Sequence, residues 1–99
     1  MLRNLKNMPY AQAKIMEDEN TIALISYTTT VIEIGKNNGW VRCYGTFSQT
    51  TRKHISAFCR EMGMGLDYYL MKKIANEGLM YNVDSKVFIN AETGVIVEG

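Results

Sequence analysis

The pattern of apolar and polar positions changes its period after residue 47. Over residues 10–16, 21–34 and 40–47, apolar side chains recur at every second position, which is typical of strands with one buried face. After residue 47 the spacing becomes i, i+3, i+4, i+7, which is typical of amphipathic helices and predicts two of them, over residues 50–62 and 67–77. The pattern therefore predicts a meander of strands followed by a helical pair.

The strongest turn signal is Asn38-Gly39, because both central positions of a type I′ hairpin turn need positive φ. A two-residue turn there places Ile34 opposite Cys43. Alternation then predicts one side with Ile32, Ile34, Val41, Cys43 and Phe47, and a second side with Val31, Glu33, Trp40, Arg42 and Tyr44.

The segment before this hairpin is predicted to extend the sheet. Residues 21–34 form one long strand if counted straight through, with a bulge near Tyr27–Thr30. Residues 10–16 suit either helix or strand. We favour strand, because a four-residue turn then lets Ile15 face Ile22. Residues 1–8 are expected to be loosely held.

Capping residues at the expected ends support the two predicted helices. Ser48, Thr50 or Thr51 can cap the first helix and Gly63 ends it. Asp67 caps the second helix and Gly78 ends it. A short hairpin over residues 86–90 and 94–98 closes the chain, with Gly94 suited to a left-handed turn position.

These elements predict a single α+β domain over residues 1–99, in which both helices cover the aliphatic face of the meander. Its 99 residues, 46% of them hydrophobic and 21% charged, exclude a disordered chain, and the net charge of +1 shows no gross imbalance. No apolar run is long enough for a membrane span and no secretory signal is visible, so a cytoplasmic protein is expected. Cys43 and Cys59 are then expected to be reduced core residues.

Two stretches resemble a known group of proteins. Residues 26–31 (Ser-Tyr-Thr-Thr-Thr-Val) and residues 44–58, with the run Phe47-Ser-Gln-Thr-Thr-Arg-Lys-His-Ile55, resemble small uncharacterised proteins encoded by phages and mobile elements of Gram-positive bacteria. The resemblance covers about residues 20–60. It implies a similar origin and fold, and it brings no activity and no residue role.

No arrangement of residues identifies a reaction. His54 is the only histidine and is expected at the border of the first helix, partly exposed, about 140° around it from Cys59. Cys43, His54 and Cys59 are too few for a metal centre, so no catalytic residue, metal or cofactor is predicted.

Two surfaces remain as candidates for binding. The second sheet side is predicted to hold aromatic and basic residues, as protein interfaces and some single-strand-binding sheets do. It is either free for a protein partner or a second copy, or covered by the N-terminal residues or the last hairpin. The candidate binding residues are Tyr10, Tyr27, Trp40, Arg42 and Tyr44.

Weak binding of single-stranded nucleic acid is the alternative, through the same face and a basic helix flank. Residues 50–75 hold five basic and two acidic residues, a local charge of +3. The basic residues are Arg52, Lys53, Arg60, Lys72 and Lys73.

Overall fold

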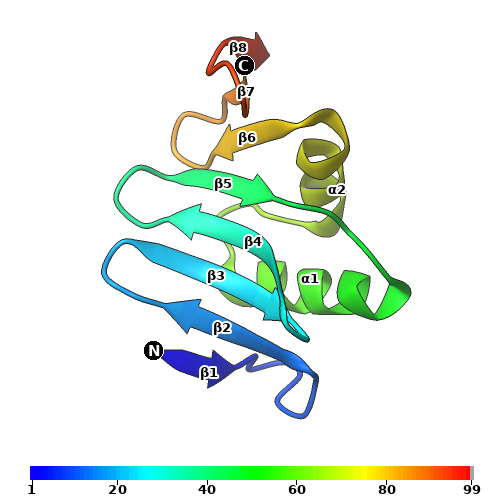
Figure 1. Ribbon diagram of the computed structural model, residues 1–99. Helices are drawn as coiled ribbons and strands as arrows, with labels where there is room; N and C mark the ends of the chain where they lie inside the picture. Colours follow the sequence, from blue (N-terminus) through cyan, green and yellow to red (C-terminus); the bar gives the residue numbers. More distant parts are fainter. Residues whose placement is uncertain (99) are drawn as a thin grey trace.

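The computed structural model describes residues 1–98 and has the predicted α+β architecture. Eight antiparallel strands form one sheet in the order β1-β2-β3-β4-β5-β6-β7-β8, and both helices lie on the same face of it (Figure 1). The strands are β1 Leu2–Asn4, β2 Ala13–Glu17, β3 Thr21–Ser26, β4 Thr29–Gly35, β5 Trp40–Cys43, β6 Leu79–Asn82, β7 Phe88–Asn90 and β8 Ile96–Glu98, and the helices are α1 Gln49–Met62 and α2 Tyr68–Glu77.

The prediction of one strand over residues 21–34 is wrong, because the chain reverses at Tyr27-Thr28. Ser26 pairs with Thr29, and Tyr27 adopts a positive φ of 57°. A β-branched or aromatic sequence without Gly or Asn carries no signal for such a turn. Residues 21–34 are therefore a hairpin of β3 and β4.

A bulge in this hairpin explains one exception to the predicted sides. The pairing shifts between Leu24 and Ile25, so that Val31 has no partner on β3. Val31 and Ile32 are consequently both buried on the helix side, although strict alternation had put Val31 on the second side. Beyond the bulge, Ile34, Val41 and Cys43 are buried as predicted.

The hairpin of β4 and β5 has a longer turn than predicted. Ile34 pairs with Val41, not with Cys43, so four residues, 36–39, form the connection. Gly39 has a φ of 77°, and the side chain of Asn38 accepts a hydrogen bond from Trp40 N at 3.1 Å. This register differs from the predicted one by two positions, so each side chain stays on its predicted side of the sheet. The observed register brings Glu33 directly opposite Arg42.

The N-terminal residues are part of the sheet, in place of the loosely held segment that was expected. β1 pairs with β2, and Leu5 is fully buried. Residues 13–17 are a strand, as favoured, but β2 begins only at Ala13, and Ile15 pairs with Leu24 instead of Ile22.

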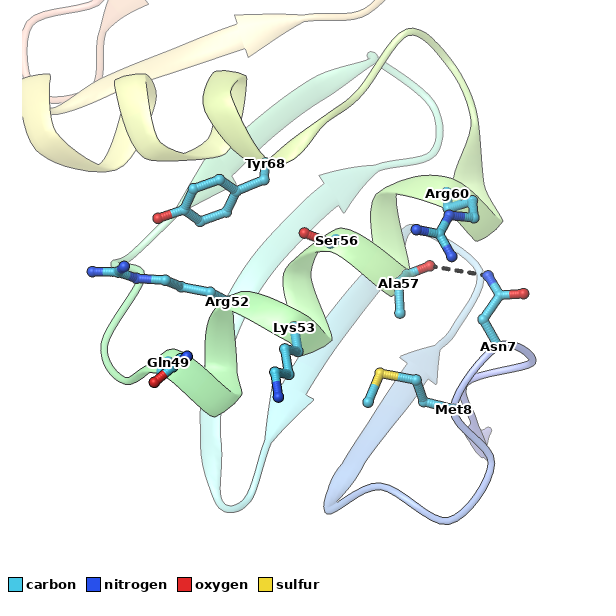
Figure 2. Close-up of a pocket in the computed structure, with 9 residues that line it drawn as sticks. All are labelled: Asn7, Met8, Gln49, Arg52, Lys53, Ser56, Ala57, Arg60 and Tyr68. Atoms are coloured by element: carbon cyan, nitrogen blue, oxygen red, sulfur yellow. Dashed lines mark hydrogen bonds between the residues drawn. The ribbon is translucent and has the colours of Figure 1, made fainter.

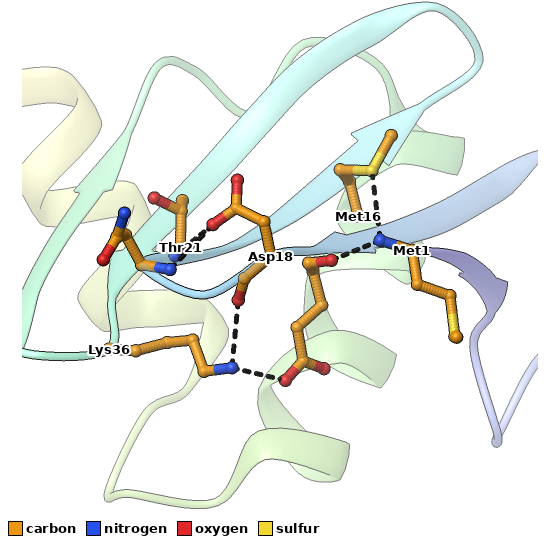
Figure 3. Close-up of polar contacts among 7 residues, drawn as sticks. Met1, Met16, Asp18, Thr21 and Lys36 are labelled. Atoms are coloured by element: carbon orange, nitrogen blue, oxygen red, sulfur yellow. Dashed lines mark hydrogen bonds and ion pairs between the residues drawn. The ribbon is translucent and has the colours of Figure 1, made fainter.

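Polar contacts fix the turn between β2 and β3 against the loop after β4 (Figure 3). Asp18 Oδ1 accepts hydrogen bonds from the backbone N–H groups of Asn20 and Thr21, both at 2.8 Å. Lys36 Nζ lies 2.8 Å from Glu17 Oε2 and donates to Asp18 O at 3.0 Å. Glu17 and Asp18 thus hold this turn in place.

The helices begin and end where the capping residues predict. Ser48 Oγ accepts from Thr51 N at 3.2 Å, and Asp67 Oδ1 accepts from Leu70 N at 2.8 Å. Gly78 ends α2 in the left-handed conformation, with a φ of 65°. The buried core between helices and sheet comprises Leu5, Ala13, Ile15, Leu24, Val31, Ile32, Ile34, Val41, Cys43, Ile55, Ala57, Phe58, Cys59, Leu66, Met71, Ile74 and Leu79.

The C-terminal third differs from the prediction in one strand. The expected hairpin forms from β7 and β8, with Gly94 at a φ of 76°, but β6 was not predicted and joins this hairpin to β5. β5 itself ends at Cys43, and Phe47, predicted to be in the core, is 57% exposed.

Candidate binding surfaces

Within residues 1–98, one face of the sheet has no second layer. Both helices pack on the opposite face, and the described N-terminal and C-terminal strands extend the sheet at its two edges instead of folding across it (Figure 1). The alternative in which the N-terminal residues or the last hairpin cover the second face is therefore wrong for residues 1–98. We call this surface the open face.

The centre of the open face is an aromatic and charged group, the open-face cluster, made of Glu33, Trp40, Arg42, Tyr44 and Met80. These five residues border a shallow depression of about 250 Å³. The Arg42 guanidinium lies 4.9 Å from the centroid of the Tyr44 ring, and the Tyr44 hydroxyl donates to Glu33 Oε1. This hydrogen bond to a carboxylate raises the pKa of Tyr44.

Of the five predicted binding residues, the structure brings together Trp40, Arg42 and Tyr44 only. Tyr10 lies in the loop between β1 and β2, where it is 98% exposed. Tyr27 lies at the turn between β3 and β4, and its ring centroid is 5.9 Å from that of His54. Glu33 and Met80 were not predicted as site residues. They belong to the open-face cluster because Arg42 pairs with Glu33 on β4 and with Met80 on β6.

His54 is buried, in contrast to the partly exposed position expected from the sequence. It is 1% exposed, and Nδ1 lies 2.8 Å from Ser26 Oγ. Ser26 Oγ also lies 3.1 Å from Thr51 Oγ1, which in turn is 3.2 Å from Ser48 Oγ. Burial lowers the pKa of His54 and favours the neutral ring. Ser26 is itself only 3% exposed, so the His54 ring and the Ser26 hydroxyl join β3 to α1 inside the protein.

The thiols are equally enclosed. Cys43 and Cys59 are free and buried, and burial raises the pKa of Cys43 and that of Cys59 to about 12. Both are therefore neutral thiols at neutral pH. Among residues 1–98, no group of three or more His, Cys, Asp or Glu side chains is placed to hold a metal ion.

A second surface lies on the outer side of α1. Arg52, Lys53 and Arg60 border a groove of about 510 Å³, the α1 groove, which Asn7 and Met8 close on one side (Figure 2). The full lining is Asn7, Met8, Gln49, Arg52, Lys53, Ser56, Ala57, Arg60 and Tyr68.

The two predicted basic residues of α2 do not belong to the groove. Lys73 pairs with Glu77 at 3.3 Å and lies 5.3 Å from the centroid of the Phe88 ring, and Lys72 is exposed beside it. The basic flank and the open face lie on opposite sides of the sheet, because α1 packs on the covered face (Figure 1). They cannot form one continuous site.

Comparisons with known proteins give a family but no activity. No curated protein and no solved structure matches the chain. In the described part of the chain, neither helix has the length and apolar content needed to cross a bilayer. A family model matches residues 1–76, which run from β1 into α2. The chain belongs to DUF8033, a family of unknown function.

Proposed function

We propose that this protein acts by binding another protein surface, and that a second copy of the chain docks on the open face. The observation that carries the proposal is an eight-stranded sheet with helices on one face only and a half-exposed aromatic cluster on the other. Antiparallel sheets expose a face to water when that face is polar. Here the exposed face carries Leu2, Met16, Trp40, Tyr44 and Met80.

The charges of the open-face cluster suit a copy of the same surface. Glu33 and Arg42 are opposite one another on adjacent strands, and Arg42 makes no ion pair with any residue of the described chain. A twofold contact brings identical surfaces together, so each patch must be self-complementary. One acid beside one base meets this condition, because Arg42 of one copy can lie against Glu33 of the other.

The dimensions of the molecule allow such a contact. The Cα extents are 39 × 29 × 21 Å, and the eight strands run side by side along the molecule (Figure 1). A stable interface buries about 800 Å² on each partner. A sheet face of this size provides that area, with aromatic and arginine side chains at its centre, where binding energy concentrates.

Replacing Tyr44 by Ala tests the proposal. We expect Tyr44→Ala to weaken self-association by about 2 kcal/mol, because it removes the central half-exposed ring. Sedimentation equilibrium over a concentration series measures the effect. Tyr10→Ala is the matched control, since it removes an equally large ring outside the open face. A wild-type chain that remains monomeric at every concentration contradicts the proposal.

A charge exchange tests the twofold contact itself. Arg42→Glu and Glu33→Arg are each expected to weaken self-association, because each places like charges against one another. Mixing the two variants restores opposite charges across the contact, so a heterodimer should form. Mixing does not change the pair of residues 33 and 42 within either variant. A heterodimer that forms on mixing therefore reports the contact between the two chains. Failure to recover argues against this geometry.

The same proposal includes an accessory role in a phage or mobile element, within the cytoplasm. It is supported by the resemblance of residues 20–60 to proteins of such elements. The genes that neighbour this one provide the test. Genes for host takeover beside it favour a protein target, and a locus with no phage or mobile-element genes contradicts the role.

A further inference from the structure

The α1 groove concentrates positive charge without compensating acids. Arg52, Lys53 and Arg60 are exposed, make no ion pair within the described chain, and share the groove with no acidic side chain. The acids nearest in sequence are engaged elsewhere. Glu61 Oε2 lies 2.6 Å from Arg3, and Asp67 Oδ1 caps α2. Asp67 lines a neighbouring hollow with Arg60, outside the groove itself.

A hydroxyl group at the edge of the groove lacks a partner. Tyr68 Oη is shielded from solvent and makes no hydrogen bond within the described chain. Figure 2 shows the ring of Tyr68 lying across from α1, with its hydroxyl turned toward Arg52. Buried polar groups are nearly always hydrogen-bonded, so this unpaired hydroxyl is a donor that an acceptor on a bound ligand would satisfy.

The spacing of the cations indicates a ligand with repeated negative charges. Arg52, Ser56 and Arg60 follow one another at intervals of four residues and therefore lie along one stripe of α1. Eight residues of helix separate the arginines by about 12 Å, which is too far for one phosphate to contact both. A strand with phosphates at regular intervals matches this arrangement, and guanidinium groups suit phosphate oxygens.

From these observations we infer that the α1 groove binds the backbone of a single-stranded nucleic acid. The three cations contact successive phosphates, and Tyr68 donates its hydroxyl to a backbone oxygen. Tyr68 is half-buried beside these cations. An aromatic side chain next to basic residues is the combination found where single strands are bound without sequence preference. The inference is independent of the proposed function, because the groove lies on the covered side of the sheet.

Fluorescence anisotropy of a labelled oligothymidylate, measured over a range of salt concentrations, tests the inference. Three phosphate contacts predict a slope of log K against log salt of about −2, since each contact on a single strand contributes about −0.7. The double variant Arg52→Ala/Arg60→Ala should reduce the slope to about −0.7. Lys72→Ala, which removes an exposed cation outside the groove, should leave affinity and slope unchanged.

Tyr68→Phe separates a binding role of the hydroxyl from a structural one. We expect about tenfold weaker oligonucleotide binding, as for loss of one hydrogen bond to a charged acceptor, with the salt slope unchanged. Resistance to urea should be equal or greater, because the substitution removes an unpaired buried hydroxyl and keeps the ring.

Several outcomes overturn the inference. One is no anisotropy change even at the lowest salt. A second is an equal loss of affinity in Lys72→Ala, which indicates general charge attraction. A third is tighter binding of a polyglutamate peptide than of oligothymidylate, which assigns the groove to an acidic protein segment. Lower stability of Tyr68→Phe contradicts the role given to its hydroxyl.

Discussion

His54 connects the sheet to α1 through a single ring that is neutral in the folded state. Burial lowers its pKa below the ordinary value of 6.5, so the unfolded chain binds a proton more readily than the folded chain does. Stability should therefore be complete above about pH 6.5 and should fall as the pH drops through that value. His54 is the only histidine, so no other imidazole contributes to this change.

Urea unfolding between about pH 8 and pH 5 measures this dependence. His54→Gln removes the titrating group, and we expect a lower overall stability with a flatter pH profile across this window. The same acid-induced loss in His54→Gln and wild type shows that other groups are responsible.

The burial of His54 could not be read from the sequence, because the helical pattern places it only at the border of the apolar stripe. What buries it is the turn at Tyr27-Thr28, which brings Ser26 and the Tyr27 ring against α1. That turn contains no Gly or Asn, the residues that usually indicate a turn with positive φ in a sequence. Because this turn was not predicted, the buried network that depends on it could not be predicted either.

At the scale of elements, local signals predicted both helices and the pairing of β2 with β3, of β4 with β5 and of β7 with β8, and they missed the pairing of β5 with β6. Ser48, Asp67 and Gly78 act within one helical turn, so their effect is visible in the sequence. β6 is four residues long and pairs with β5, which lies about 40 residues earlier in the chain. A pairing between such distant segments cannot be predicted from local sequence patterns. The open face was nevertheless predicted in part, because a register error of two positions preserves the sides of a strand.

Asn82 at the end of β6 joins two loops that the sequence does not connect. Its Nδ2 donates to Asn38 O at 2.9 Å, and its Oδ1 accepts from the N–H groups of Asp84 and Ser85, both at 2.9 Å. The Asn82 side chain is buried, with 7% of the residue exposed. Asn82→Ala should therefore lower the free energy of unfolding by about 1–3 kcal/mol, because the backbone groups that Asn82 bonds are left unsatisfied.

The control for this prediction is Asn90→Ala. Asn90 Oδ1 accepts from Glu92 N and Thr93 N in the same manner, but Asn90 is half-buried in the last hairpin, and within residues 1–98 its side chain makes no hydrogen bond to another loop. Urea unfolding should show the smaller loss for Asn90→Ala. Equal losses contradict a special role for the contact with Asn38.

For the whole molecule, the two proposed surfaces lie on opposite sides of one sheet. A dimer that packs open face to open face leaves both α1 grooves on its outer sides, pointing away from the contact. Such a dimer can hold two separate strands at once, and a monomer can hold one.

Energy transfer between two oligothymidylates, one with a donor dye and one with an acceptor dye, distinguishes these states. Wild type at concentrations where it self-associates should bring the two dyes together. Tyr44→Ala should lose this signal and keep its affinity for a single short oligonucleotide, because Tyr44 is on the other side of the sheet from the groove. If Tyr44→Ala weakens the binding of one short strand as much as Arg52→Ala does, the open face itself contacts nucleic acid, and the separation of the two surfaces is wrong.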